Sequence, residues 1–266
     1  MTAPTARPLA LITGASSGIG AAYAEQLAQK GYDLILVARR RDRLEALARQ
    51  LETQHGAKSE VLEADLGTPQ GVSRVTERIL AVKLELLVNN AGFAHYAPVA
   101  ETPESELEGM ILLNVLALVQ LTRAALPGML ERAYGGIINV GAGLAFRPGA
   151  SRATYSGTKA FMLNFTRSLA EEVQSAGLRV QALIPGLIRT EFHERSGTDL
   201  GNFPASMIMD PQDLVRASLI GLERGETVCI PAQRDPAQLE NLFRAQDEMA
   251  AEFVRNGQVA ERYRQT

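Results

Sequence analysis

Short apolar runs alternate with segments of helical periodicity along most of the chain. The apolar runs lie at 9–12, 33–38, 61–62, 86–88, 137–140 and 179–184. Between them, apolar residues recur three, four and seven positions apart, which indicates amphipathic helices. Continuously apolar strands that alternate with helices are typical of a parallel sheet covered on both faces. The pattern therefore predicts an α/β fold, with a doubly wound parallel sheet between two helical layers.

The alternation continues without a linker, a repeat or a low-complexity tract, so we expect a single domain over 1–266. Its core is expected over 8–190, and the polar, glycine-rich stretch 190–210 is expected to be a mobile loop at the substrate. The tail 236–266 has helical periodicity and is expected to pack on the outside as a helical extension. A (β/α)₈ barrel is the competing architecture, but it has no special need for a glycine-rich turn directly after its first strand.

Composition and charge narrow the classes of function. The residues are 46% hydrophobic and 21% charged, and the net charge is −3 without a long basic run, which gives no support for nucleic-acid or anionic-membrane binding. The single cysteine, Cys229, excludes an internal disulfide. His55, His95 and His193 have no metal-ligand spacing, so no metal is expected. The apolar run at 9–12 is too short for a signal peptide, and no run reaches membrane-spanning length; we expect a cytoplasmic protein.

A glycine-rich turn follows the first expected strand. Gly14, Gly18 and Gly20 lie in the segment Thr-Gly-Ala-Ser-Ser-Gly-Ile-Gly (13–20) and open a helix. A tight turn, close approach to a pyrophosphate and packing of the helix on the sheet each favour a residue without Cβ. The helix N-terminus then offers unpaired N–H groups to phosphate. The segment predicts a dinucleotide site.

The end of the second strand indicates which dinucleotide binds. Proteins that bind NAD usually place an acid there for the ribose 2′-hydroxyl, whereas this chain has Ala38 and then Arg39. Guanidinium groups would pair with a 2′-phosphate, so NADP(H) is the predicted cofactor, with Arg39 as the first candidate and Arg40 in support. The alternative is a solvated arginine-rich turn, because Arg41 and Arg43 follow.

Tyr155 and Lys159 form a candidate acid/base pair. They are four residues apart at the start of an apolar, helical segment. That spacing places both side chains on one face of a helix, about 6 Å apart along the axis. An ammonium group favours phenolate and would lower the pKa of the tyrosine. Taken alone, the pair is also compatible with an ordinary helix surface.

Several motifs in order resemble the short-chain dehydrogenase/reductase family over about 8–190. They are the segment 13–20, Asp65 after the third strand, Asn-Asn-Ala-Gly (89–92), Asn114, the Tyr155/Lys159 pair and Pro185-Gly186. The resemblance implies a Rossmann-like, three-layer α/β/α sheet structure, a nicotinamide cofactor and hydride transfer between a carbonyl and an alcohol. It also implies a homodimer or homotetramer, usually built through the helices that hold Asn114 and Tyr155.

The resemblance also implies roles for individual residues. Tyr155 would donate or accept the proton, Lys159 would hold the nicotinamide ribose, and Asn114 would position a water in the proton relay. Asp65 would contact adenine, Asn89 would line the cofactor site, backbone around 185–188 would meet the carboxamide, and Thr190 would reach the phosphates. The cofactor positions implied are Gly14, Ser16, Ser17, Gly18, Ile19, Gly20, Arg39, Arg40, Asp65, Leu66, Asn89, Ala91, Gly92, Tyr155, Lys159, Pro185, Gly186, Ile188 and Thr190.

One residue departs from the family pattern. The serine that steadies the substrate oxygen normally lies thirteen residues before the tyrosine, and that position is Ala142. Loss of one oxyanion donor typically costs about 10²–10³ in rate. Either the substrate supplies a hydrogen-bonding group, or another side chain replaces the serine, or the reaction does not need it, or the chain is an engineered variant.

Replacement donors are sought first in the loop after Asn-Asn-Ala-Gly, at His95 and Tyr96. His95 is equally compatible with a wall or surface position that has no chemical role. Leu144 and Phe192 complete the candidate substrate-binding residues.

The primary functional prediction is an NADP(H)-dependent carbonyl reductase or alcohol dehydrogenase with Tyr155 as acid/base. Ala142 keeps a second hypothesis open, namely C=C reduction or a cofactor-retaining isomerisation or rearrangement. A third hypothesis is a redox-silent NADP(H)-binding sensor or scaffold. The intact tyrosine–lysine pair disfavours it, because a pure sensor has no use for an acid/base pair.

Overall fold

One parallel sheet organises the computed structural model, which describes residues 7–264. The strand order is β3-β2-β1-β4-β5-β6-β9, and each adjacent pair is parallel. The chain builds outwards from β1 to β3, then crosses back to β4 and builds the other way, which confirms the doubly wound fold. The bounds are β1 Leu9–Thr13, β2 Asp33–Ala38, β3 Ser59–Glu63, β4 Leu86–Asn89, β5 Gly136–Val140, β6 Arg179–Leu183 and β9 Val228–Cys229.

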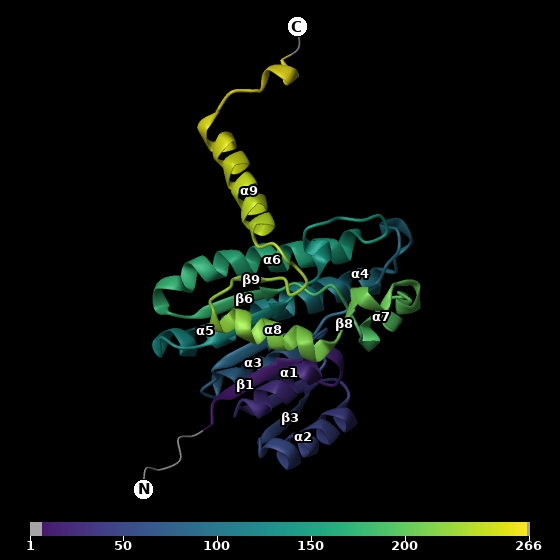
Figure 1. Cartoon of the computed structure of the whole chain (residues 1–266), viewed down its shortest axis with the longest axis vertical. Helices are drawn as coiled ribbons and strands as arrows, with labels where there is room; N and C mark the ends of the chain where they lie inside the picture. The colour runs from purple at the N-terminus through teal and green to yellow at the C-terminus, as the bar shows by residue number, and fades with distance from the viewer. Residues whose placement is uncertain (1–6, 265–266) are drawn as a thin grey trace. The chain divides into compact units, whose positions relative to one another are not determined.

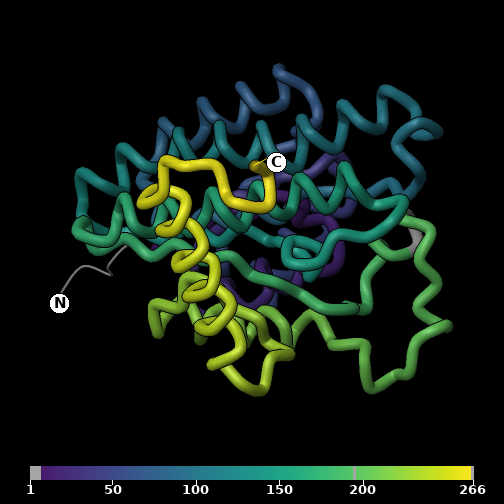
Figure 2. The backbone as a smooth tube through the Cα atoms, turned by 90° about the horizontal axis from the view of Figure 1, so that it is seen from above, coloured from purple at the N-terminus to yellow at the C-terminus, as the bar shows by residue number. Residues whose placement is uncertain are grey.

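Helices cover both faces of this sheet, and the layers can be followed in Figures 1 and 2. Strand side chains alternate between two cores: Ile12 and Leu36 pack with one set of helices, whereas Leu11 and Val37 pack with the other. This two-sided burial explains why the strands read as continuous apolar runs. The first layer contains α1 Gly18–Gln29, α2 Arg41–His55 and α8 Pro211–Glu223; the second contains α3 Pro69–Leu80, α5 Leu118–Glu131 and α6 Ala153–Val173.

A long helical run crosses the second layer. It consists of α4 Glu104–Ile111, a π-helical segment Leu112–Ala117, and α5, which continues past Pro127 to its end at Glu131. By length and composition alone, Glu104–Glu131 could span a membrane. Part of its apolar surface is buried within the fold, where Leu121 and Met129 pack against the sheet, while Ile111, Leu116 and Leu130 are exposed.

The stretch expected as a substrate loop contains short elements. They are α7 Glu191–Arg195, two 3₁₀ helices and the strand β8 Ile208–Met209, which pairs with β7 Leu187–Ile188 just before the stretch. The 3₁₀ helices of the described chain are Val99–Glu101, Gly143–Ala145, Gln174–Ala176, Leu200–Asn202, Ala205–Met207 and Glu261–Tyr263.

Residues from Ala232 onwards form a separate compact unit. It contains α9 Ala237–Arg255, in which no residue is buried. The helical periodicity of the tail therefore predicts its secondary structure correctly. Packing of the tail on the outside of the domain stays a prediction.

Candidate active site

A cavity of about 1100 Å³ opens at the carboxyl ends of the strands, beside the point where β1 is followed by β4 in the sheet. Ligands of doubly wound sheets bind at such a switch point. The structure brings most of the predicted site residues together here. The predicted residues that line the cavity are Gly14, Ser16, Ser17, Gly18, Ile19, Arg39, Arg40, Asp65, Leu66, Ala91, Gly92, His95, Tyr96, Ala142, Leu144, Tyr155, Lys159, Pro185, Gly186, Ile188, Thr190 and Phe192. Gly20, Asn89 and Asn114 are not among the lining residues.

The glycine turn has the geometry that a phosphate cradle requires. Gly14 and Gly18 have φ of +67° and +55°, a region that residues with a Cβ rarely adopt. A Cβ at Gly18 would lie 2.9 Å from Cγ2 of Thr190, so the turn and the loop after β7 are in close contact. Gly20 has a different role and does not line the cavity. A Cβ there would collide with the Gly14 carbonyl oxygen, so a glycine is needed for α1 to pack against the turn.

The prediction that Asn89 lines the cofactor site is wrong. Its side chain is buried, and Nδ2 donates to Thr122 Oγ1 (3.1 Å) and to Asn139 Oδ1 (2.9 Å). The neighbouring Asn90 lines the cavity instead, and its Nδ2 donates to the Thr13 carbonyl at 2.9 Å. Asn89 is the last residue of β4 and pairs with Asn139 across the sheet, which directs its amide into the core.

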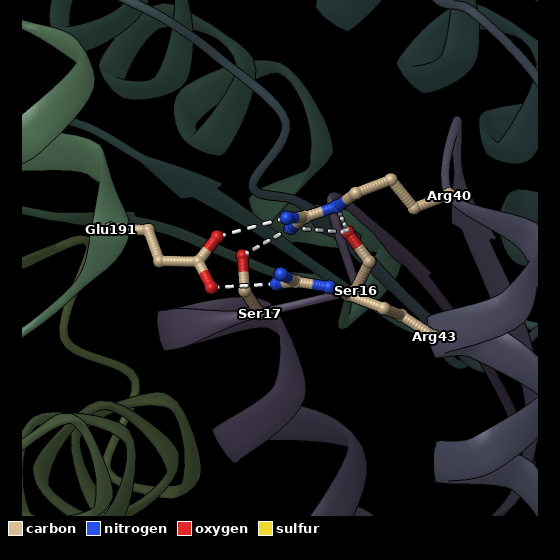
Figure 3. A network of polar contacts seen from close by, with 5 residues as sticks. All are labelled: Ser16, Ser17, Arg40, Arg43 and Glu191. Carbon is tan, nitrogen blue, oxygen red and sulfur yellow. Dashed lines mark hydrogen bonds and ion pairs between the residues drawn. The ribbon is translucent and has the colours of Figure 1, made fainter.

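Arg40 is the better-placed of the two predicted phosphate ligands. Its guanidinium donates to the hydroxyls of Ser16 (3.0 Å) and Ser17 (2.8 Å) in the glycine turn. It also donates to Glu191 at 2.9 Å, and Arg43 donates to the other oxygen of that carboxylate at 2.6 Å (Figure 3). These two arginines lower the pKa of Glu191 to about 2.

Arg39 also lines the cavity, but its side chain is exposed. The sequence ranks Arg39 first because it follows the strand directly, whereas the structure places Arg40 against the turn. The donors of Arg40 together with the positive-φ glycines fit a dinucleotide that carries an additional phosphate.

Tyr155 and Lys159 lie in the first two turns of α6 and are both buried. Lys159 Nζ donates to the Val140 carbonyl at 3.0 Å and lies 5.6 Å from the centroid of the Tyr155 ring. Burial raises the pKa of Tyr155, with a further contribution from Tyr96, and burial lowers the pKa of Lys159 to about 8. The net pKa of Tyr155 is raised because desolvation outweighs any lowering by the Lys159 charge. That Lys159 favours the phenolate stays a prediction. The cavity contains a protonated phenol.

Asn114 lies behind the cavity and connects two of its walls. Its Oδ1 accepts from the Phe93 N–H (3.1 Å), while Nδ2 donates to the Phe93 carbonyl (2.9 Å) and to Thr158 Oγ1 (3.3 Å). The residue is in the π-helical segment, a distortion that is frequent at functional sites. These bonds fix the loop after β4 against α6. A water-positioning role stays a prediction.

An apolar wall surrounds the phenol of Tyr155. Ala142 and Leu144 pack in the same cluster, the Tyr96 ring meets the Tyr155 ring edge-on at 5.7 Å, and the Phe192 ring lies at 6.1 Å. Ser156 does not take the place of the missing serine, because its hydroxyl donates to the Leu144 carbonyl at 3.0 Å. The wall beside Tyr155 is therefore methyl and aromatic, with Ala142 at the position where the sequence leads us to expect a serine hydroxyl.

Sequence reasoning missed several lining residues. Phe93 follows the Asn-Asn-Ala-Gly motif directly, so its position after a strand end was an available signal. Arg147 and Arg152 lie in the loop before α6, and the Arg152 guanidinium lies 5.0 Å from the Tyr96 ring centroid. Glu191 reaches the cavity from a segment about 150 residues after Arg40, and no local pattern could have indicated that contact.

Known proteins that resemble this chain in sequence or in structure are dehydrogenases and reductases. Residues 8–201 match the short chain dehydrogenase family. Very-long-chain 3-oxoacyl-CoA reductases from Anas platyrhynchos and Phaeosphaeria nodorum are 31% and 34% identical, over 84% and 81% of this chain. The chain spans 72% and 63% of their own lengths.

Solved structures cover nearly the whole chain. A short-chain dehydrogenase from Sphingobium yanoikuyae in complex with NADPH is 38% identical with a TM-score of 0.91, covering 96% of this chain and all of its own. The bulky-bulky ketone specific alcohol dehydrogenase from Comamonas testosteroni is 33% identical with a TM-score of 0.88, covering 96% of this chain and 98% of its own. Together with the glycine turn, the Arg40 donors and the buried tyrosine–lysine pair, these matches show that the chain belongs to the short-chain dehydrogenase/reductase family and is an NADP(H)-dependent oxidoreductase.

Proposed function

We propose that the enzyme reduces ketones to secondary alcohols, with Tyr155 as the proton donor. The observation that carries the proposal is the position of the Tyr155 phenol, which lines the cavity beside the buried ammonium group of Lys159. This phenol is protonated at neutral pH and can transfer its proton to a carbonyl oxygen as negative charge develops there. When NADPH is bound, it supplies the hydride that adds to the carbonyl carbon.

Lys159 supports the proton transfer through its charge. With a pKa of about 8, its ammonium group is mostly protonated at pH 7. Because Nζ lies 5.6 Å from the Tyr155 ring centroid, its positive charge stabilises the phenolate that remains after the proton has left. The hydrogen bond to the Val140 carbonyl holds the ammonium at the end of β5.

We assign the cofactor 2′-phosphate to Arg40, with Arg39 at the rim of the same site. Ser16 and Ser17 orient the Arg40 guanidinium beside the glycine turn. Asp65 and Leu66, which follow β3 and line the cavity, are assigned to the adenine. Thr190 lies against Gly18 and is assigned to the phosphates.

The substrate class follows from the wall around Tyr155. Phe93, Tyr96, Leu144 and Phe192 offer apolar and aromatic surface, and Ala142 adds a methyl group where a hydroxyl would demand a polar partner. We propose ketones with an apolar group on each side of the carbonyl. The likeness to an alcohol dehydrogenase specific for bulky-bulky ketones supports this class, as does the likeness to 3-oxoacyl-CoA reductases.

We propose that the enzyme is a cytoplasmic homodimer or homotetramer. Exposed apolar residues on the helices that hold Asn114 and Tyr155, including Leu116 and Phe161, favour a homodimer or homotetramer through this layer. The composition favours a cytoplasmic protein without a membrane partner. Fractionation of producing cells tests the location, with recovery in the membrane pellet as the contrary result.

Product analysis is the experiment that tests the proposed reaction. The purified protein is incubated with NADPH and a panel of small ketones, bulky ketones and α,β-unsaturated ketones, and the products are separated by gas chromatography. The proposal predicts secondary alcohols from saturated ketones, with the bulky members turned over fastest. Saturated ketones formed from enones would instead support C=C reduction, which Ala142 kept open. Isomerised product without net NADPH oxidation would support a rearrangement, and no turnover with intact NADPH binding would support a sensor.

A further inference from the structure

One carboxylate joins Arg40 and Arg43 to the segment that follows β7. Glu191, the first residue of α7, accepts from Arg40 through Oε2 (2.9 Å) and from Arg43 through Oε1 (2.6 Å), as Figure 3 shows. Arg40 directly precedes α2, and Arg43 lies in the first turn of that helix. Both bridges therefore connect α2 to α7 at the edge of the cavity.

The carboxylate occupies donors that a phosphate would need. A guanidinium presents its N–H groups in a planar fork that suits a carboxylate or a phosphate equally well. Arg40 already donates to Ser16 and Ser17. An incoming phosphate would therefore have to take over the N–H that now donates to Glu191. The low pKa of Glu191 means that it is ionised throughout the physiological range, so it would repel a second anion placed on the same arginines.

We propose that Glu191 is a specificity-determining residue that competes with the cofactor 2′-phosphate for Arg40 and Arg43. NADPH must displace the carboxylate in order to gain its phosphate contacts, whereas NADH has no 2′-phosphate and leaves the bridges in place. Glu191 thus weakens NADPH binding selectively and reduces the margin by which the enzyme prefers NADP(H). The inference rests on the assignment of the 2′-phosphate to Arg40 proposed above.

Binding of NADPH and NADH to Glu191→Gln tests the competition without a need for turnover. The two nucleotides differ only in the 2′-phosphate, and nucleotide fluorescence reports binding of both at fixed ionic strength. We expect the variant to bind NADPH about 3- to 10-fold more tightly, in line with the loss of two partly exposed ion pairs, and to bind NADH within about twofold of the wild type. Glu60→Gln is the matched control, because Glu60 forms a comparable bridge with Arg78 away from the cavity.

Unchanged NADPH affinity in Glu191→Gln would overturn the inference, because the bridges would then be ordinary solvated pairs. Weaker NADPH binding would also overturn it, because Glu191 would then orient the arginines for the phosphate rather than compete with it. In an Arg40→Ala/Arg43→Ala background the gain from Glu191→Gln must disappear, since the contested donors are gone.

Arg40→Ala separates a failure of this inference from a failure of the phosphate assignment. We expect it to weaken NADPH at least about tenfold while NADH changes little, because it removes charge-assisted bonds to the 2′-phosphate alone. If NADPH binding survives this change, the assignment fails. If Arg40→Ala behaves as expected and Glu191→Gln does not, only the competition fails.

Discussion

Ala142 lies where the motif spacing leads us to expect a serine. Its methyl group packs in the cluster that contains Tyr155, so a hydroxyl there would lie beside the phenol and the substrate oxygen. We predict that Ala142→Ser raises kcat for small ketones by about tenfold. This is less than the factor of about 10²–10³ that one oxyanion donor typically contributes to kcat. It should also raise KM for bulky ketones, because the wall becomes polar and larger.

Steady-state kinetics with one small and one bulky ketone check this prediction. Gly157→Ser is the control, since it adds the same side chain at an exposed position of α6 where a Cβ meets nothing within 4 Å. A lower kcat for both ketones in Ala142→Ser would show that the site does not use a donor at this position.

The pKa of Lys159 leads us to predict how the rate of ketone reduction depends on pH. Its pKa is about 8 in the folded protein, so its charge is present below that pH and is lost as the pH rises through it. We expect kcat/KM for ketone reduction to be level from pH 6 to 7.5 and to fall above about pH 8, because the phenolate then lacks its stabilising charge. The pKa of Tyr155 is raised, so the tyrosine remains protonated across this range.

The titration of Lys159 does not itself destabilise the fold over this range. The folded-state pKa of Lys159 lies below the ordinary value of 10.5, so the unfolded chain binds more protons between these two values. The contribution of Lys159 to the free energy of unfolding therefore rises with pH across this window. Thermal melts recorded at each pH provide the check, and kcat/KM that stays level to pH 10 would contradict the role of Lys159.

At the scale of the element, two neighbouring asparagines at the end of β4 have different positions. The amide of Asn89 is buried in the core, whereas Asn90 lines the cavity. Asn89→Ala removes the buried donor to Thr122 Oγ1 and Asn139 Oδ1, and we expect it to lower the free energy of unfolding by about 1–3 kcal/mol. NADPH affinity should stay close to that of the wild type. Asn90→Ala is the counterpart and should weaken NADPH binding instead. Urea denaturation and NADPH titration of both variants give the answer, and a reversed pattern would restore Asn89 to the cofactor site.

The same scale shows what the sequence could reveal about the fold and the site. The strands β1, β2, β4, β5 and β6 were predictable because they are buried on both faces, whereas the edge strand β3 gives a weaker apolar signal. The glycine turn was predictable because its backbone excludes a Cβ at Gly14 and Gly18. β9 escaped prediction because only Val228 and Cys229 belong to it. The sequence pointed to Asn89, whereas Asn90 lines the cavity, and it did not show that Arg40 rather than Arg39 contacts the glycine turn. A motif identifies a segment, but tertiary contacts decide where each neighbouring side chain lies.

For the whole molecule, the second helical layer is the surface on which association is expected. Phe161 is 43% exposed on α6, and its ring stacks on that of Phe165 at 5.9 Å. We predict that the wild type is a dimer or tetramer in solution and that Phe161→Glu shifts it towards the monomer, because a carboxylate is costly to bury in an interface. Ile220→Glu is the control in the other layer, where Ile220 of α8 is 39% exposed. Light scattering after size-exclusion chromatography checks both, and a monomeric wild type would contradict the prediction.

The central claim is that the buried phenol of Tyr155 donates the proton in ketone reduction, and Tyr155→Phe tests it most directly. This variant keeps the ring that packs with Tyr96 and Phe192 and removes only the hydroxyl. The measurement pairs NADPH binding by fluorescence with single-turnover ketone reduction on the same preparation. The account predicts NADPH affinity within about twofold of the wild type and a reduction rate lower by about 10²–10⁴. Undiminished ketone reduction in Tyr155→Phe would contradict it.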